Sequence, residues 1–448
     1  MKRRFSLIAI IFFSLLASFA GNISFTGLAH PEIDVTPAAT TGLQAVYVLS
    51  PGAEPRICYE AASSGTPVIW KRFSNLGAAY AQDIPASDVT VSGRMSSVAL
   101  GTDDCGYVIE EGSRATYIWV VNYNNHSCTL NSVSVSPSSD CQRTILDING
   151  HADRISFFTI NGRQETLSRD IEVNYHTLLF DENTFSYIQK PTSVLLSDLS
   201  GTVSVPAPLC NTEFTVTADR FLASWNRPLT ARSESYSTIA LEATTEAFQD
   251  TVKINNQMSE PNATLGGSAP VPVSFRAAVT DAVVFTEWQV SSNPDFEGID
   301  MRYTQTDVDI VFTEQGYSYV RFVADNAAGT CEFASPVYEV FIGESRLECP
   351  NAFSPLSSPG VNDIWKVSYK SLISFECHIY NRQGLQMYSF SDPSDGWDGK
   401  YCGKLVSPGT YYYVITAEGS DGVQYKKSGD INIIGPSNHS GGGAVTED

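Results

Sequence analysis

The chain lacks the short motifs that mark the common enzyme classes. It has no GxSxG nucleophile elbow, no phosphate-binding P-loop and no GxGxxG dinucleotide fingerprint. Its six histidines are scattered, without the HExxH or HxH spacing that gathers metal ligands. The sequence therefore carries no signal for a hydrolase, a nucleotide-dependent enzyme or a metalloenzyme. We expect a protein that is not an enzyme and that needs no cofactor and no metal.

Basic residues and long apolar runs are scarce as well. The chain has 28 Lys and Arg against 49 Asp and Glu, a net charge of −21, which disfavours nucleic acid and anionic membranes as partners. Residues 1–20, MKRRFSLIAIIFFSLLASFA, join three cations to a short apolar run that ends in small residues, the pattern of a cleaved signal peptide. No later run approaches the roughly 18 apolar residues of a membrane span. We therefore expect export into the periplasm and a mature chain that does not span the membrane.

Closely spaced cysteine pairs, which a structural zinc site needs, are also missing among the nine cysteines. In an oxidising compartment dispersed cysteines form disulfides, and a bridge needs Cα atoms within about 7 Å, which favours partners in one domain. An odd count leaves at least one thiol outside an internal bridge. The pairs that we expect are Cys105 with Cys128, Cys141 with Cys210, and two of Cys349, Cys377 and Cys402.

What the chain does contain is a succession of short alternating runs broken by Gly, Pro, Asn and Ser. Hydrophobic residues make up 42% and charged residues 17%, a balance typical of folded domains. The run TYIWVVNY, residues 116–123, is apolar on nearly both faces, which predicts a central strand. The NG pairs at 149–150 and 161–162 supply turn chemistry. The fold class predicted is all-β, with tandem immunoglobulin-like β-sandwiches.

Composition shifts and turn clusters divide the chain. In the third domain, FTEWQVS and GYSYVRFVADNAAG resemble the tryptophan strand and the glycine-tyrosine strand of polycystic-kidney-disease (PKD) type immunoglobulin-like domains. The polar, glycine-rich stretch before it reads as a linker. The predicted segments are a signal peptide at 1–20, β-sandwiches at 33–137 and 138–247, a linker at 248–269, a PKD-like domain at 270–344, a C-terminal domain at 347–435 and a flexible tail at 436–448.

The C-terminal domain contains six blocks in a fixed order, from PNAFSP through GVNDIW, IYNRQG, WDGKYCGK and PGTYYYVI to SGDINII. This order closely resembles the gliding motility-associated C-terminal domain of Bacteroidota, although Gln383 stands where that family usually has tryptophan. The resemblance implies a small β-sandwich that acts as a type IX secretion address, with the secretion machinery as partner. The residues that it marks as address candidates are Pro350, Asn351, Phe353, Pro355, Val361, Asn362, Asp363, Asn381, Arg382, Gly384, Trp397, Asp398, Gly399, Gly409 and Tyr411.

Several of these residues also have a purely structural interpretation. Trp397 beside Asp398-Gly399 is ordinary hairpin chemistry as well as a possible recognition surface. The three tyrosines at 411–413 alternate between the two faces of a strand, so we expect them to divide between core and rim. In ISFECHIY, residues 373–380, the same alternation predicts a half-buried strand with Ile373 facing the core.

The leading hypothesis is a type IX secretion cargo that is displayed at the cell surface or released. Its passenger domains would act as an adhesin that binds a glycan or a protein, an assignment based on fold-level analogy. One alternative is a structural or docking component of the envelope or of the secretion and gliding machinery. Another is a glycan-active hydrolase, because β-sandwich glycosidases hold catalytic carboxylates that are far apart in sequence.

Overall fold

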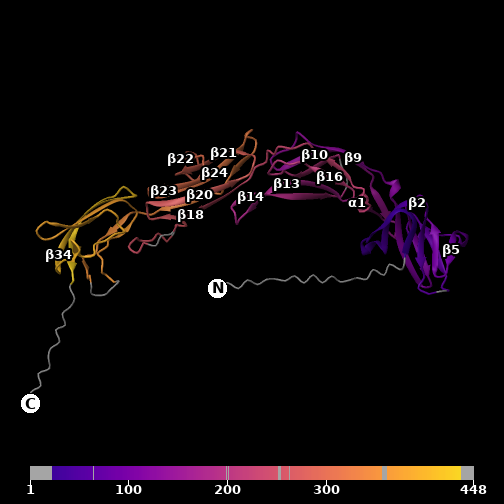
Figure 1. Cartoon of the computed structure of the whole chain (residues 1–448), viewed down its shortest axis with the longest axis horizontal. Coiled ribbons are helices and arrows are strands. Elements are labelled where there is room, and N and C mark those ends of the chain that lie inside the picture. Colours follow the sequence, from indigo (N-terminus) through magenta and orange to yellow (C-terminus); the bar gives the residue numbers. More distant parts are fainter. Residues whose placement is uncertain are drawn as a thin grey trace, which may run out of the picture. The chain divides into compact units, whose positions relative to one another are not determined.

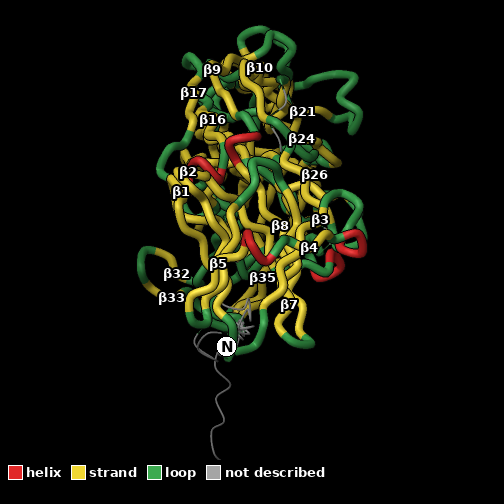
Figure 2. The backbone as a smooth tube through the Cα atoms, turned by 90° about the vertical axis from the view of Figure 1, so that its right-hand side faces the viewer, coloured by secondary structure: helices red, strands yellow, loops and turns green. Residues whose placement is uncertain are grey.

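A computed structural model describes residues 23–63, 65–197, 199, 201–250, 254–261, 263–355 and 361–434. The predicted signal peptide and the predicted tail lie outside these ranges. Strands dominate the described residues, and the helical segments between them are short (Figure 2). The all-β prediction is thus confirmed. The chain divides into two compact units, one within Met1–Thr177 and Lys190–Ser237 and the other within Leu178–Gln189 and Thr238–Asp448.

The first unit begins with a large sheet around the long strand β2, which pairs along its length with β1 and then with β6 and β8. Strand β8 lies between β7 and β2, as its apolar pattern predicts: Trp119 and Val121 face one core, whereas Ile118 and Val120 face another. The strands are β1 (Ile23–Val35), β2 (Ala45–Glu60), β3 (Val68–Phe73), β4 (Gln82–Asp83), β5 (Val89–Ser92), β6 (Met95–Ala99), β7 (Cys105–Glu111) and β8 (Arg114–Asn122).

The same unit continues as a sandwich of two small sheets, in which Leu146 and Val203 of one sheet pack against Val173 and Val216 of the other. A separate hairpin, β11 (Ile155–Phe158) with β12 (Gln164–Leu167), packs against the core of the preceding sheet. The remaining strands, several of which are labelled in Figure 1, are β9 (Cys128–Val135), β10 (Arg143–Ala152), β15 (Thr202–Pro206), β13 (Ile171–Asp181), β14 (Ser186–Leu196), β16 (Thr215–Ala218) and β17 (Leu229–Arg232), of which the end of β13 and the start of β14 are counted with the second unit.

A five-residue helix, α1 (Arg220–Ser224), joins these two parts of the first unit. The Asp219 carboxylate caps it by accepting a hydrogen bond from the Leu222 N–H at 2.9 Å. Phe221 and Trp225 pack in one hydrophobic cluster with residues of the first sheet, and Trp225 Nε1 donates to the Pro31 carbonyl at 2.8 Å. The two parts therefore share a hydrophobic core and are not independent domains.

The second unit begins with another sandwich, in which Trp288 is fully buried between Phe275 and Phe322. Strand β24 turns Val320 and Phe322 inward, as its alternation predicts. The smaller sheet contains β18 (Ala243–Phe248), β20 (Val271–Val279) and β23 (Asp307–Phe312), and the larger one β19 (Leu265–Gly267), β21 (Val283–Ser291), β22 (Met301–Tyr303), β24 (Gly316–Asn326), β25 (Glu332–Ala334) and β26 (Tyr338–Ile342).

The segment 248–269, which the sequence predicts as a linker, carries structure of its own. Strand β19 pairs in parallel with β26, and β18, placed by the sequence in the second domain, pairs with β20 of the third. Within the same unit, Glu260 forms an ion pair with Lys370 at 2.9 Å, and the Met258 N–H donates to the Tyr369 carbonyl at 2.7 Å. Polar composition made this stretch look like a spacer, but several of its described polar groups bond to neighbouring strands.

The C-terminal domain is a five-stranded sheet in the order β28-β35-β34-β30-β31, with two further two-stranded sheets. Its core gathers Phe353, Trp365, Trp397 and Tyr411 with the inward residues of β30 and β35. The strands are β27 (Arg346–Glu348), β28 (Ala352–Phe353), β29 (Ser368–Lys370), β30 (Leu372–Tyr380), β31 (Gln386–Phe390), β32 (Lys400–Tyr401), β33 (Lys404–Leu405), β34 (Gly409–Gly419) and β35 (Gln424–Ile433).

Candidate recognition sites

The address candidates of the C-terminal domain fall into a buried group and a surface group. The buried group forms one packed cluster: Trp397 lies 5.6 Å from Phe353 and 5.1 Å from Tyr411 between ring centroids. Gly399 has φ +76°, and a Cβ added there would stand 3.2 Å from Pro355, so glycine fits both the backbone and the space. The side chains of Trp397, Phe353 and Tyr411 are buried in one core cluster. They therefore stabilise the fold and are not accessible to a partner.

Trp397 is also tied to a second buried tryptophan through the backbone. Trp365 and Trp397 exchange two main-chain hydrogen bonds, at 2.9 and 3.0 Å, and the Trp397 indole donates to the Lys400 carbonyl at 3.0 Å. Asp398 accepts a hydrogen bond from the Lys400 N–H at 3.0 Å and pairs with the Lys400 ammonium, and these bonds lower the pKa of its carboxyl against the opposing effect of burial. Residues 397–400 therefore form a hydrogen-bonded turn. This agrees with the structural interpretation of Trp397 and Asp398 as hairpin residues.

Most of the remaining candidates shape turns with their polar atoms. Asn381 accepts hydrogen bonds from the N–H groups of Gln383 and Leu385, and Gly384 has φ +82° in the same turn. The Pro350 carbonyl accepts from the Trp365 indole at 2.7 Å, and the Asn362 carbonyl accepts from the Ser354 N–H at 2.9 Å. Asn351 directly precedes β28, Gly409 is the first residue of β34, and Asp363 follows Asn362 in the chain.

One exposed surface of the domain, which we call the outer sheet face, is defined by Tyr380, Arg382, Tyr412 and Val414; Arg382 is the address candidate among them, and another candidate, Val361, is itself 60% exposed. Tyr412 lies opposite Tyr380 in the sheet, and Val414 lies opposite His378. Tyr412 and Val414 are exposed, whereas Tyr411 is 9% exposed, so the predicted division of the tyrosines between core and rim is confirmed. Arg382 is exposed in the turn directly after Tyr380. The sequence did not single out Val414 or Tyr380.

Two predictions about this domain are wrong. Ile373 is 43% exposed, because a register shift between Leu372 and Ser374 lets Leu372 take the inward position instead. The expected disulfide among Cys349, Cys377 and Cys402 is not formed, since all three are thiols. Burial raises the pKa of Cys377 to about 12, whereas Cys402 is exposed on a turn.

The expected disulfides of the first unit are also wrong. Cys105, Cys128 and Cys210 are thiols, so neither Cys105 with Cys128 nor Cys141 with Cys210 is a bridge. Cys141 is disulfide-bonded, but its partner is therefore not Cys210. The pairs were expected because their partners were placed in one domain, but a shared domain does not by itself bring two Cα atoms within the distance that a bridge needs.

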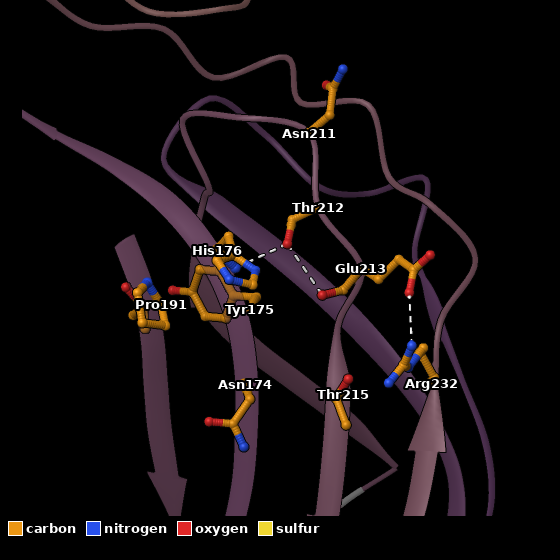
Figure 3. A pocket seen from close by; sticks show the side chains of 10 residues that line it. Asn174, Tyr175, His176, Pro191, Asn211, Thr212, Glu213, Thr215 and Arg232 are labelled. Carbon is orange, nitrogen blue, oxygen red and sulfur yellow. Dashed lines mark hydrogen bonds and ion pairs between the residues drawn. The ribbon is translucent and has the colours of Figure 1, made fainter. Parts of the chain in front are cut away.

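A polar pocket of about 310 Å³ lies beside strands β13, β16 and β17 (Figure 3). Thr212 Oγ1 accepts from the His176 N–H at 2.9 Å and donates to the Glu213 carbonyl at 3.2 Å, and the Glu213 carboxylate pairs with Arg232 at 3.4 Å. The ring of Tyr175 lines the pocket but is itself 4% exposed. Several polar groups of the pocket thus already bond to one another, and its tyrosine ring is buried.

A second pocket, of about 410 Å³, lies in the first domain, and we call it the Arg72 pocket. One wall is the segment after β3, which contains the 3-10 turn η2 (Ala78–Tyr80) and then β4; the other is the loop 101–104 before β7. Arg72 projects between them, over the ring of Tyr107 at 5.5 Å from its centroid. Tyr80 and Leu76 stand exposed at the rim.

A buried charge cluster, which no sequence pattern indicated, lies at the joint within the first unit. The Arg169 guanidinium contacts the Asp219 carboxylate at 2.5 Å, and the Tyr123 hydroxyl donates to the same oxygen at 2.9 Å. The side chain of Arg169 is 2% exposed and that of Asp219 0%. Burial, and then the neighbouring Asp219, raise the pKa of Tyr123, so this phenol remains a neutral donor.

In chemical terms, no group of three or more His, Cys, Asp or Glu residues within the described ranges is placed to hold a metal ion. No helix among the described residues is both long and apolar enough to cross a membrane. We take as candidate recognition sites the outer sheet face, the polar pocket of Figure 3 and the Arg72 pocket.

Comparison with known families assigns two parts of the chain. Residues 132–233 match the fibronectin type III domain family, and residues 347–433 match the CHU_C type IX secretion signal domain family. No curated protein matches the chain.

Solved structures with a similar fold are multidomain and immunoglobulin-like. They include a tetra-tandem repeat from the extending region of a large adhesion protein, at 11% identity over 85% of this chain and 95% of that chain with a TM-score of 0.19. Immunoglobulin domains 1–5 of Sidekick-1 match at 11% identity over 93% and 78%, TM-score 0.28. A Ca²⁺-stabilised adhesin that helps an Antarctic bacterium bind ice matches at 11% over 93% and 99%, TM-score 0.19.

TM-scores this low do not indicate function. The domains of this chain are therefore assigned from the family matches and from the all-β architecture. The resemblance of the C-terminal domain drawn from the sequence is confirmed, and immunoglobulin-like domains precede it as expected, whereas the PKD-type resemblance of residues 270–344 stays a prediction. The chain carries a C-terminal domain of the type IX secretion signal family at residues 347–433, preceded by fibronectin type III and immunoglobulin-like domains.

Proposed function

We propose that this protein is a type IX secretion cargo whose C-terminal domain is the export address and whose preceding domains are a binding passenger. The observation that carries the proposal is the secretion-signal match over 347–433 on a domain with a complete core of its own. A machinery that accepts many different passengers needs a part that is common to all of them. A small folded domain after the passenger meets that need without constraining the passenger's surface.

The outer sheet face is the surface that we assign to recognition by the machinery. The buried candidates, such as Trp397 and Phe353, are closed off, so a partner must read what is exposed. Tyr412 and Val414 expose apolar surface, and the exposed cation Arg382 lies in the turn after Tyr380, the residue opposite Tyr412. An apolar patch with aromatic and arginine side chains is the composition enriched at protein interfaces.

For the passenger we propose binding at the cell surface or in the medium, as an adhesin, in preference to catalysis. Rigid β-sandwiches that present pockets at their loops are typical scaffolds for recognition. The polar pocket and the Arg72 pocket lie on such a scaffold in the first unit, and the shared core around Phe221 and Trp225 keeps its parts fixed. The strong negative charge of the chain keeps it away from anionic surfaces.

The test is the location and intact mass of the protein in its native host. We would compare the full chain, a form deleted from residue 347 onward, and the double variant Arg382→Ala with Val414→Asp. Val91→Ala, an exposed position on β5 of the first sheet, is the matched control. We expect the full chain and the control outside the cell, and the deletion and the double variant in the periplasm.

Two results would contradict the proposal in different ways. If the deleted form also leaves the cell, the domain is no address. If the full chain stays in the periplasm of a secretion-competent cell, the docking-component alternative is favoured. If the double variant is exported, the C-terminal domain can still be the address, but the outer sheet face is not the surface that the machinery recognises.

A further inference from the structure

We infer that the Arg72 pocket binds a neutral sugar ring of a glycan chain. The inference deepens the proposed binding role and rests on it for its biological setting, but it is argued from the pocket alone. The pocket has about 410 Å³ of space, within the range of small-ligand sites.

The two walls of the pocket are held in place before any ligand arrives. The Ala78 N–H donates to the Ile160 carbonyl of the β11–β12 turn at 2.7 Å, which anchors the wall that carries Tyr80. On the other wall, the amides of Asn122 and Asn125 both donate to the Thr102 carbonyl at 2.8 Å. A ligand therefore pays little ordering entropy for these loops, which favours affinity.

The second wall is fixed at its base by a charged hydrogen-bond pair. Asp104 accepts from the Asn122 N–H at 2.8 Å and contacts His126 Nε2 at 2.6 Å. Its carboxylate is thereby committed to the protein. Asp103, the next carboxylate along this loop, is exposed and lines the pocket.

Arg72 supplies the donors. Its guanidinium lies over Gly101, where a Cβ would stand 3.5 Å from Nη1, and makes one long hydrogen bond of 3.5 Å to the Tyr107 hydroxyl. It forms no ion pair with any residue in the described ranges. Because arginine has five N–H donors in a planar fork, most of them remain available to a ligand in the pocket.

Tyr80 and Leu76 supply the apolar platform. They are 69% and 62% exposed at the rim of the pocket, so both side chains are accessible to a ligand there. A tyrosine ring presents an apolar face and a polar tip, which suits a ligand that is apolar on one face and polar at its edge. A sugar ring has this character, with C–H groups on its face and hydroxyls around its rim.

The polar groups discriminate among ligand classes. A guanidinium from Arg72, a carboxylate from Asp103 and an amide from Gln82 together offer donors and acceptors to neighbouring hydroxyls. Asp103 and the net charge of −21 disfavour polyanions such as nucleic acid or uronate polymers. A peptide added as an extra strand is disfavoured because the edge strand β4 has only two residues.

The experiment is affinity electrophoresis of the purified full chain through gels that contain soluble glucan, mannan, galactan or xylan, with alginate as the acidic comparison. We expect retardation by at least one neutral polysaccharide. Tyr80→Ala and Arg72→Ala should each weaken it about tenfold, the effect of losing one principal contact. The control is Val91→Ala, which has the same 69% exposure at the opposite edge of the same sheet.

Failure of retardation in all neutral gels, or equal retardation of Tyr80→Ala and Val91→Ala, would overturn the inference. Retardation in alginate alone would overturn the neutral class. Because purified protein is used, these results are independent of export: a chain that binds but stays in the periplasm would contradict the proposed function and not the pocket.

Discussion

Replacing Arg169 by methionine tests how the first unit is joined, since methionine keeps much of the volume and removes the charge. Arg169 Nη1 lies 2.5 Å from Asp219, Nε donates to the Asp153 carbonyl at 2.8 Å, and Nη2 donates to the carbonyls of His126 and Ser127 at 3.2 and 3.3 Å. The substitution strands a fully buried carboxylate and removes the donor from three carbonyls. Removing one partner of a buried ion pair costs about 3–5 kcal/mol, so we expect that loss in the free energy of unfolding of this unit.

Hydrogen-exchange mass spectrometry of the full chain in increasing urea, read on peptides from residues 215–232, measures this free energy locally. The double variant Arg169→Met with Asp219→Asn is the decisive comparison, because asparagine can still cap the Leu222 N–H while its charge is gone. We expect the double variant to recover a clear part of the loss. A cost below about 1 kcal/mol for Arg169→Met, or a double variant no better than the single one, would refute the reasoning.

Three further predictions follow from the packing and the titrating groups. Trp397→Ala should destabilise the C-terminal domain by about 3–5 kcal/mol in urea unfolding, whereas Trp397→Phe should cost clearly less, and equal costs would contradict the core role. Hydrogen bonds from Ser127, and then the contact with His151, lower the pKa of Asp153 from 3.8 to about 2, so its contribution to stability is complete above pH 4 and is lost as the pH falls toward 2; Asp153→Asn should remove that part of the acid dependence of the urea midpoint. In the native protein a maleimide should label Cys402 well before the buried Cys377, with mass spectrometry of the labelled peptides as the readout and Cys402→Ser as control.

Local alternation predicted individual strands well because a two-sided or half-buried strand repeats its pattern every two residues. Strands β8 and β24 lie as their patterns require, with Trp119 and Phe322 facing their cores. Alternation predicts the wrong face of a strand where one residue breaks the two-residue period. A register shift exposes Ile373, and the NG pair at 149–150 lies at a register shift inside β10 and forms no hairpin turn there, whereas Gly162 does lie in a turn.

Features that depend on distant segments could not be predicted from the sequence. The disulfide partner of a cysteine, the pairing of β19 with β26 and the Arg169–Asp219 contact all join residues that no local pattern connects. The Arg72 pocket also depends on segments that are apart in the sequence. One of its walls precedes strands β5 and β6 in the chain, and the other follows them. The only sequence signals for it were an arginine and a tyrosine near turns, which are common on any surface.

The C-terminal domain shows why a family motif can be identified from sequence while its recognition surface cannot. Its strongest motif residues, Trp397, Phe353 and Tyr411, are core residues, and Asn381 and Asp398 shape turns. Such positions mark the fold, since any other residue there would disturb it. An export machinery must instead read exposed groups, which the fold displays without needing them. Substitutions on the outer sheet face should therefore separate export from stability, whereas substitutions in the motif core should affect both together.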